Sequence, residues 1–353
     1  MTNILTCNPI LTKQLIESDS LPKDFLAQNY KEIYSNYREN FPSNKFFYDR
    51  TGTIPHYLNV EKDICPIPEI NGFNLSFDQV VEKRAKELLS LGKPINVSWS
   101  GGIDSTFVLL TLYHYAADKS QIKIYGTYNS VIESGYYFDH YVKDKIKYNI
   151  HTPKSLKNNY ICPDNEIFVT GAMGNDLFAP GLVFGNRDSW MIFKIPKETP
   201  NIFNMRYQDV LHDNNIKFLE EFIKKSPRKI ETLQDLRVWV SFSFNWYNCV
   251  TNFHIGIGRD RAEKVYAFFD SDDFQRWAMT HNDPQTKTGD YTDERWQMRD
   301  KITEYTGDPT YSINKKKVTS VMTTFGESWL FLLNDYSNIY LEDLQSPTSV
   351  SYK

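Results

Sequence analysis

The clearest hydrophobic pattern of the chain runs through residues 76–116. Residues 76–92, SFDQVVEKRAKELLSLG, carry apolar side chains at helical spacing between an N-capping Ser76 and a terminating Gly92, which predicts an amphipathic helix. The next segment, PINVSWS, alternates apolar and polar residues and predicts a strand. The following STFVLLTLYHYAA is apolar on nearly every face, which predicts a buried helix.

Weaker patterns continue this alternation of strands and helices. QIKIYGTY (121–128) and EIFVTGA (166–172) predict strands, and YYFDHYVKDKIKYN (136–149) predicts a helix between them. Strands that alternate with helices are typical of an α/β fold, with a parallel sheet and right-handed crossovers. After about residue 215 the patterns are mostly helical, in IKFLEEFIKK, TLQDLRVWVSFSFNWYNCV, DFQRWAMTH and DERWQMRDKITEYTG.

These patterns predict three parts in chain order. Residues 1–75 are irregular and predict a small N-terminal subdomain or arm. Residues 76–215 predict the α/β domain, and residues 216–353 predict a helical part that packs on it and completes it.

Composition narrows the class of protein. The 353 residues carry a formal net charge of −4, so no general attraction to nucleic acid or to an anionic membrane is expected. The four cysteines are far apart, which is typical of buried thiols in a reducing compartment. No apolar run approaches the ~20 residues of a membrane span, and the N-terminus lacks signal-peptide features. We therefore expect a soluble, cytoplasmic protein.

The loop between the predicted strand and the buried helix, called the seam below, contains the candidate functional residues. It reads SGGIDS, and two glycines there allow a close backbone approach to an anion at the helix N-terminus. Asp104 would repel a phosphate unless Mg²⁺ bridges the two, which indicates a metal-bound pyrophosphate. The seam lacks the Gly-Lys-Ser/Thr of a Walker A loop. The alternative is a Gly-Ser turn that only connects a strand to a helix.

SGGIDS resembles the pyrophosphate loop of the ATP pyrophosphatases, which cleave ATP between the α and β phosphates. Three later stretches, in the same order as in that family, resemble segments of the asparagine synthetases; they are VTGAMGNDLFAPG (169–181), GRDRAEKVYAFFDSDDFQRWAM (258–279) and INKKKVTSVMTTFGESW (313–329). Together they cover about residues 76–335. The chain thus resembles an asparagine-synthetase-like synthetase domain, a group that includes β-lactam synthetases and lasso-peptide cyclases.

This resemblance implies a fold and a set of site residues. The fold is an adenine nucleotide alpha hydrolase-like sheet of five parallel strands with helices on both faces, plus a helical C-terminal part. The residues implied to bind ATP are Ser100, Gly101, Gly102, Asp104, Ser105, Thr106, Tyr125, Gly126 and Gly171. Asp104 and Asp176 would share Mg²⁺, and Lys317 or Lys316 would stabilise the charge that develops on the departing pyrophosphate.

Two departures from the family pattern limit the reaction. Glutaminase members begin with Met-Cys, whereas Thr2 follows Met1 here, so glutamine hydrolysis is not expected. The second loop of the family carries a catalytic Glu, and the matching position here is Ala172, or Met173 if one residue is gapped. Asn175 or Asp176 then matches the metal-binding acid, and Asp176 is preferred because it keeps the charge that Mg²⁺ requires.

Other residues carry structural alternatives. Lys315, Lys316 and Lys317 would also suit a solvated loop, and Asp260 with Arg261 would suit a tie between helices. The lone histidines His254 and His281 are expected to be structural, as is the aromatic run FSFNWYN (242–248).

The sequence therefore predicts an ATP-dependent, AMP- and pyrophosphate-forming C–N ligase that adenylates a carboxylate, or an amide or carbonyl oxygen, of its substrate. Its partners would be a small molecule or peptide that bears the carboxylate, and ammonia or a substrate amine. Two alternatives remain open: a nucleotide-binding protein that has lost catalysis, and a related enzyme that modifies a nucleotide base.

Overall fold

The computed structural model of the chain describes residues 3–6, 27–40, 49–56, 66–151, 165–174, 177, 193–196, 199–246, 264–280, 296–311, 330–334 and 337–339. The chain forms two compact units. Unit 1 comprises residues 1–67, 180–256 and 327–353, and unit 2 comprises residues 68–179 and 257–326. The units interleave along the chain, whereas the three parts expected from the sequence follow chain order.

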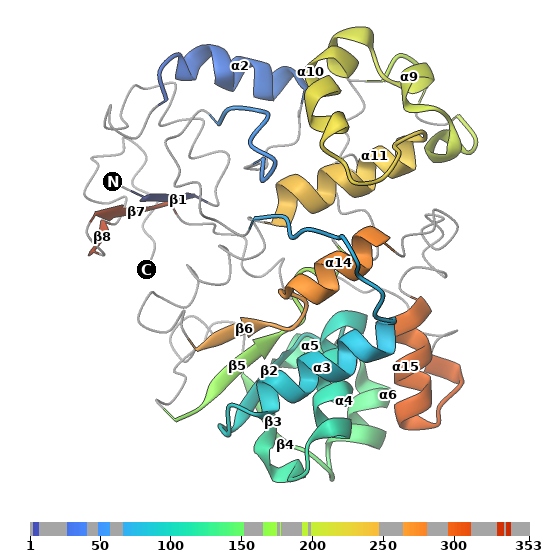
Figure 1. The fold of residues 1–353 in the computed structure, drawn as a ribbon. Helices are drawn as coiled ribbons and strands as arrows, with labels where there is room; N and C mark the ends of the chain where they lie inside the picture. The colour runs from blue at the N-terminus through green and yellow to red at the C-terminus, as the bar shows by residue number, and fades with distance from the viewer. Residues whose placement is uncertain are drawn as a thin grey trace. The chain divides into compact units, whose positions relative to one another are not determined.

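Unit 2 holds the sheet that the sequence predicted. Its elements in chain order are α3 (Phe77–Leu89), β2 (Ile95–Trp99), α4 (Ile103–Tyr115), η2 (Lys119–Gln121), β3 (Ile122–Thr127), α5 (Tyr128–Glu133), α6 (Gly135–Tyr137), η3 (Phe138–Val142), β4 (Lys147–His151), β5 (Ile167–Thr170), β6 (Val265–Ala267), α14 (Asp272–Thr280) and α15 (Trp296–Thr306). The five strands β2–β6 form one sheet in which every pair is parallel (Figure 1). The α/β class and the five-stranded parallel sheet are thus confirmed.

The strand order β4-β3-β2-β5-β6 contains a topological switch point. From β2 the chain moves outward through β3 to β4, and then returns to β5 on the other side of β2. In open α/β sheets, ligands bind beyond the carboxyl ends of the strands where the order reverses. The loops that follow β2 and β5 lie at that position.

Helix α3 begins where its sequence predicts. The Ser76 hydroxyl accepts a hydrogen bond from the backbone N–H of Gln79, and the Gln79 side chain accepts one from the backbone N–H of Ser76, which completes a capping box. Arg84 is buried on this helix and donates to the carbonyl oxygens of Ala267 and Phe268, both at 3.0 Å. This arginine ties α3 to the end of β6.

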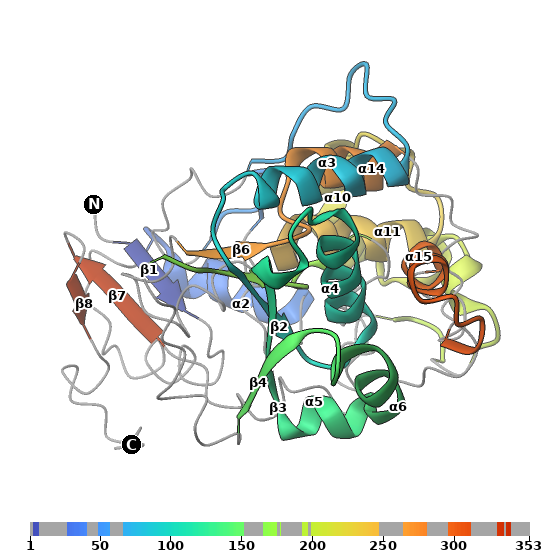
Figure 2. The ribbon, with the colours of Figure 1, turned by 90° about the horizontal axis from the view of Figure 1, so that it is seen from below.

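Helix α4 is the centre of the packing in unit 2. The side chains of residues 105–109 and of Leu112 are almost fully buried, as expected for a helix that is apolar on nearly every face. Helices α3 and α15 both pack on α4, and α14 packs on α3, as Figures 1 and 2 show from two sides. The ring of Phe107 stacks on those of Phe77 and Phe269, with centroids 5.8 and 5.9 Å apart. Burial of one such side chain contributes about 1.5–3 kcal/mol.

The helix predicted over residues 136–149 is wrong in its second half. Residues 136–142 are helical, but Lys147–His151 form strand β4, which pairs with β3. The polar sequence of β4 suits an edge strand, which has one partner and an exposed side. Strand β6 was also not predicted; it has only three residues and lies within a stretch interpreted as helix and turn.

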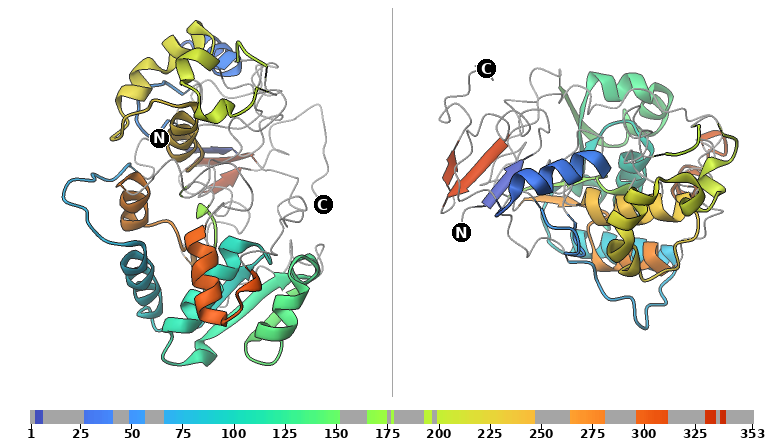
Figure 3. Two further views of the ribbon diagram at one scale, coloured as in Figure 1. Left: turned by 90° about the vertical axis from the view of Figure 1, so that its right-hand side faces the viewer. Right: turned by 90° about the horizontal axis from the view of Figure 1, so that it is seen from above.

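Unit 1 combines helices with a small antiparallel sheet. Its elements are β1 (Asn3–Thr6), α2 (Tyr30–Asn40), η6 (Ile202–Asn204), α9 (Tyr207–Val210), α10 (Asp213–Lys224), α11 (Leu233–Val240), η7 (Ser241–Asn245), β7 (Leu330–Asn334) and β8 (Ser337–Ile339). The strand order is β1-β7-β8, so strands from the two ends of the sequence pair (Figure 3). The Arg50 guanidinium lies 5.0 Å from the ring of Phe242 and 5.1 Å from that of Trp246.

The helices that the structure describes include none with both the length and the apolar character needed to cross a bilayer.

Candidate phosphate-binding site

The loop between β2 and α4 is shaped by two glycines with different roles. Gly101 has a φ of +77°, and a Cβ added to it would collide with the carbonyl oxygen of Ser130 on α5. Gly102 has an ordinary φ of −77°, and a Cβ there would have Ser100 Oγ as its nearest neighbour, at 3.2 Å. Gly101 is therefore required by the packing of the loop on α5, whereas Gly102 lies on the more open side of the loop.

Two serine hydroxyls hold the loop in shape. Ser105 Oγ accepts from the backbone N–H of Ser100 at 3.0 Å and donates to the carbonyl oxygen of Gly102 at 3.2 Å. Ser100 Oγ lies 3.0 Å from Ser105 Oγ and accepts from the N–H of Gly102 at 3.2 Å. Ser105 is buried and Ser100 is partly exposed, so the Ser100 hydroxyl is the one at the loop surface.

Thr106 stabilises the loop from its buried side, through a hydrogen bond to Trp99 at the end of β2. Its side chain is fully buried, and its Oγ1 accepts a hydrogen bond from the Trp99 indole N–H at 3.0 Å. Burial raises the pKa of Tyr311 well above its usual range; the nearby Thr106 hydroxyl and the charge of Arg299 oppose the rise, and the carboxylates of Asp104 and Glu133 add to it. Thr106 therefore belongs to the interior face of the site.

The loop after β5 touches the start of α4. A Cβ added to Gly171 would lie 2.8 Å from the backbone N of Ser105, and a Cβ added to Gly174 would lie 2.5 Å from Oδ1 of Asp104. Asp104 itself is partly exposed, but its Oδ1 is buried. Both predicted loops thus meet at Asp104, and the contact requires glycine at both positions.

The position matched to the missing Glu of the family has no carboxylate. Ala172 is partly exposed, and its N–H donates to Thr170 Oγ1 at 3.4 Å. Met173 is buried and has a φ of +70°, which is unusual for a residue with a side chain. A left-handed backbone at this residue directs the chain into the close approach of Gly174.

Tyr125 and Gly126 lie within β3. Gly126 pairs with Trp99, and a Cβ there would lie 3.0 Å from the Trp99 carbonyl oxygen. The Tyr125 side chain is 6% exposed and packs edge-on against Phe168, with centroids 5.2 Å apart. By strand alternation these two rings lie on the sheet face opposite to Trp99.

The structure brings two further side chains to the loop that the sequence did not single out, Glu133 and Tyr311. Glu133 on α5 has its Oε1 3.7 Å from the position of a Cβ on Gly102. Tyr311, which follows α15, lies near Thr106 and Asp104, and the charge of the buried Arg299 on α15 acts on it. No motif marks them, because their proximity to the loop depends on the packing of α5 and α15.

Several predicted residues lie outside the described ranges. These are Asp176, Lys316 and Lys317, together with Asn175, Asp260, Arg261, His254, His281 and the four cysteines. Within the ranges that are described, no group of three or more His, Cys, Asp or Glu side chains gathers to hold a metal ion. The predicted magnesium pair is thus represented by Asp104 alone.

No protein-family model matches the chain. No curated protein matches it either. The likeness to the asparagine synthetases therefore rests on the quoted motifs.

The arrangement suits the binding of an anion. The free N–H groups and positive dipole end of the 13-residue helix α4 point toward the loop, at the carboxyl end of β2. Ser100 adds a hydroxyl, and the absence of a Cβ on Gly102 leaves room between Ser100 Oγ and Glu133 Oε1. A phosphate group fits these donors, and Asp104 at the same helix start is the one carboxylate within the loop.

Proposed function

We propose that the protein is an ATP-dependent ligase that adenylates a substrate carboxylate, releases pyrophosphate and passes the acyl group to an amine. The observation that carries this proposal is the meeting of the two loops at the switch point of the sheet, with Gly171 against Ser105 and Gly174 against Asp104. A phosphate site alone needs only the first loop. A second glycine loop packed on the acidic residue of the first favours an adenylating site, because the two loops together would enclose a metal-bound pyrophosphate from both sides.

The proposed roles follow from the position of each group. The N-terminus of α4, the Ser100 hydroxyl and the open side of Gly102 hold the β and γ phosphates. Asp104, with Asp176, would hold Mg²⁺, which when bound neutralises the charge of the pyrophosphate. Lys317 or Lys316 meets the charge that grows as the α–β bond breaks. Under this proposal the sheet is of the adenine nucleotide alpha hydrolase type, and the protein acts in the cytoplasm.

A second candidate is a nucleotide-binding protein without catalysis. It is favoured by Ala172 and the buried Met173, which leave no carboxylate at the position matched to the family Glu. Glu133 brings a carboxylate close to Gly102 in the same loop, so the site still contains an acid that a base-dependent transfer would use.

The deciding experiment identifies the products of ATP. The full chain is incubated with ATP, Mg²⁺ and a panel of carboxylates, with ammonia or an amine as acceptor, and the nucleotide products are separated. AMP and pyrophosphate that appear only with a particular carboxylate support the ligase. Pyrophosphate that appears only with a nucleobase substrate supports the base-modifying alternative. ATP binding without turnover supports the binding protein, and ADP with phosphate contradicts all three.

A further inference from the structure

A polar pocket lies on the sheet face opposite to α4. Its volume is about 220 Å³, and it is lined by Asn96, Lys123, Ile124, Tyr125, Lys147, Tyr148, Asn149, Glu166 and Phe168. Both faces of a parallel sheet are normally apolar, as this sheet is on the α4 side, where Ile95, Val97 and Ile122 are buried. Polar and charged side chains on the other face are therefore unusual for this fold.

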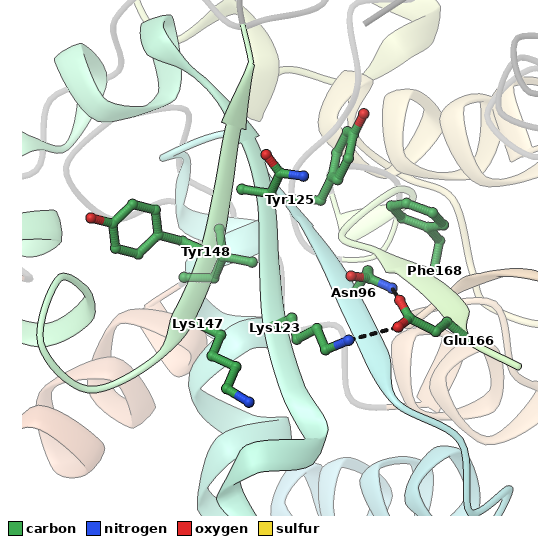
Figure 4. A pocket seen from close by; sticks show the side chains of 9 residues that line it. Asn96, Lys123, Tyr125, Lys147, Tyr148, Glu166 and Phe168 are labelled. Atoms are coloured by element: carbon green, nitrogen blue, oxygen red, sulfur yellow. Dashed lines mark hydrogen bonds and ion pairs between the residues drawn. The ribbon is translucent and has the colours of Figure 1, made fainter. Parts of the chain in front are cut away.

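The polar side chains are held in a definite arrangement. Glu166 accepts from Lys123 Nζ at one carboxylate oxygen and from Asn96 Nδ2 at the other, both at 2.6 Å (Figure 4). Partial burial alone would raise the pKa of Glu166, but these two hydrogen bonds and the charge of Lys123 outweigh it and lower the pKa. By accepting these two hydrogen bonds, the carboxylate pairs with Lys123 and fixes the position of its ammonium at the pocket.

A second cation gives the pocket a net positive charge. Lys147 on β4 is the register partner of Lys123 on β3, so the two side chains leave the sheet on the same face. Lys147 has no ion-pair partner within 4 Å among the described residues. Its charge contributes to lowering the pKa of Asp118, which does not line the pocket. With Lys123, Lys147 and Glu166 as its charged groups, the pocket carries a net charge of about +1 at neutral pH.

The rest of the pocket provides an aromatic wall. Tyr125 and Phe168 pack edge-on at 5.2 Å, and both are buried. A volume near 220 Å³ is below the ~300–1,000 Å³ that is usual for drug-sized ligands, so the occupant must be small.

This pocket is distinct from the phosphate-binding loop. Asn96, Lys123 and Lys147 lie at the amino-terminal ends of β2, β3 and β4, whereas the loop follows the carboxyl end of β2. Ser100 is four residues further along the chain than Asn96, which corresponds to about 13 Å in an extended strand.

We propose that this pocket binds a small organic anion, with a carboxylate held between Lys123 and Lys147 and a flat apolar body against Tyr125 and Phe168. An ammonium has three N–H donors, and Lys123 uses one on Glu166, which leaves two for the ligand. The Asn149 amide supplies a further polar contact at the wall. The inference does not depend on ATP chemistry.

The test uses 4-fluorobenzoate as the probe, followed by ¹⁹F NMR with the full chain. We expect saturable binding that Lys147→Gln weakens by about tenfold, the loss typical of one charge-assisted hydrogen bond. Lys143→Gln is the matched control. Lys143 is exposed in the same unit but does not line the pocket, so this substitution removes the same charge elsewhere on the surface. Equal affinities in the wild type and in both variants would overturn the proposal.

Two further probes separate the parts of the ligand. Neutral 4-fluorobenzamide should bind much more weakly, and inorganic phosphate should not displace 4-fluorobenzoate at equal concentration. 4-Fluorobenzamide lacks the charge of the ligand, and phosphate lacks its apolar ring. Binding of the amide as tight as that of 4-fluorobenzoate, or displacement of 4-fluorobenzoate by phosphate, would therefore overturn the proposal. Asp104→Asn should leave 4-fluorobenzoate binding unchanged, so failure of the ligase proposal remains distinguishable.

Discussion

Gly174 lies so close to Asp104 that a Cβ on residue 174 would fall 2.5 Å from the Asp104 Oδ1 atom and 2.8 Å from its Cγ. Phe269 would be 3.1 Å away on the remaining side. The two residues are seventy positions apart in the sequence. Their contact sets the position of the acidic side chain at the start of α4.

Gly174→Ala is expected to impair the site through this contact. The added methyl group must displace the Asp104 carboxylate or the Phe269 ring, and such overpacking costs about 1–3 kcal/mol. We expect a lower Tm and a lower rate of pyrophosphate formation. Gly135→Ala is the control, since a Cβ at Gly135 meets nothing within 4 Å. A Gly174→Ala protein with wild-type Tm and rate would show that the contact is unimportant.

Gly101 and Gly102 should separate folding from binding. Gly101→Ala forces a left-handed residue against the Ser130 carbonyl oxygen, which should cost about 2–4 kcal/mol of unfolding free energy. Gly102→Ala should change this free energy by less than about 1 kcal/mol. It should weaken ATP binding on the order of tenfold, because the added methyl group would hold the phosphate away from the helix N-terminus and cost one charged hydrogen bond. Urea unfolding and equilibrium ATP binding measure the two effects. The reverse ranking would contradict the geometry of the loop.

Asp104→Asn should abolish turnover and preserve the fold. The substitution keeps the size of the side chain and removes the charge that Mg²⁺ requires, so we expect at least an ~10²-fold loss of AMP formation and a Tm change below about 3 °C. Asp139→Asn, at an exposed position, controls for the lost charge. Normal turnover in Asp104→Asn would refute the magnesium role.

Lys317→Ala or Lys316→Ala should slow the release of pyrophosphate while ATP still binds. Loss of one contact to developing charge typically costs ~10²–10³ in rate. Lys315→Ala is the neighbouring control, with the same change of charge. Full activity in the Lys316/Lys317 double variant would contradict the proposed role of these lysines, but not the proposed binding of phosphate by the loop between β2 and α4.

Glu166→Gln should destabilise the protein near neutral pH but have less effect in acid. The pKa of Glu166 is lowered in the folded protein, so its contribution is present above the ordinary value of about 4.3 and is lost as the pH falls through the lowered pKa. We expect a loss of about 1–3 kcal/mol at pH 7. Urea unfolding of wild type and variant at pH 7, 4 and 3 should show the difference shrinking.

Glu69→Gln serves as the control for that series, because Glu69 is exposed and the substitution is the same. A difference between Glu166→Gln and wild type that is equal at pH 3 and pH 7 would show that the ion pair with Lys123 does not account for the effect.

Three elements follow from local signals in the amino-acid sequence. The capping residue Ser76, the alternation before Trp99 and the continuous apolar run after Asp104 predict α3, β2 and α4 with nearly correct bounds. The glycines and serines of the loop were also found, because the backbone conformation that they permit is a property of neighbouring residues.

Which distant segments of the chain meet depends on the tertiary fold. Strands β4 and β6 become strands by pairing with β3 and β5, and strand formation depends on that partner more than on intrinsic preference. The approach of Gly174 to Asp104, of Glu133 to Gly102 and of Lys147 to Lys123 depends on the strand order and register of the sheet. A local pattern cannot contain these relationships, because hydrogen bonds and packing between strands join residues that are far apart in the chain.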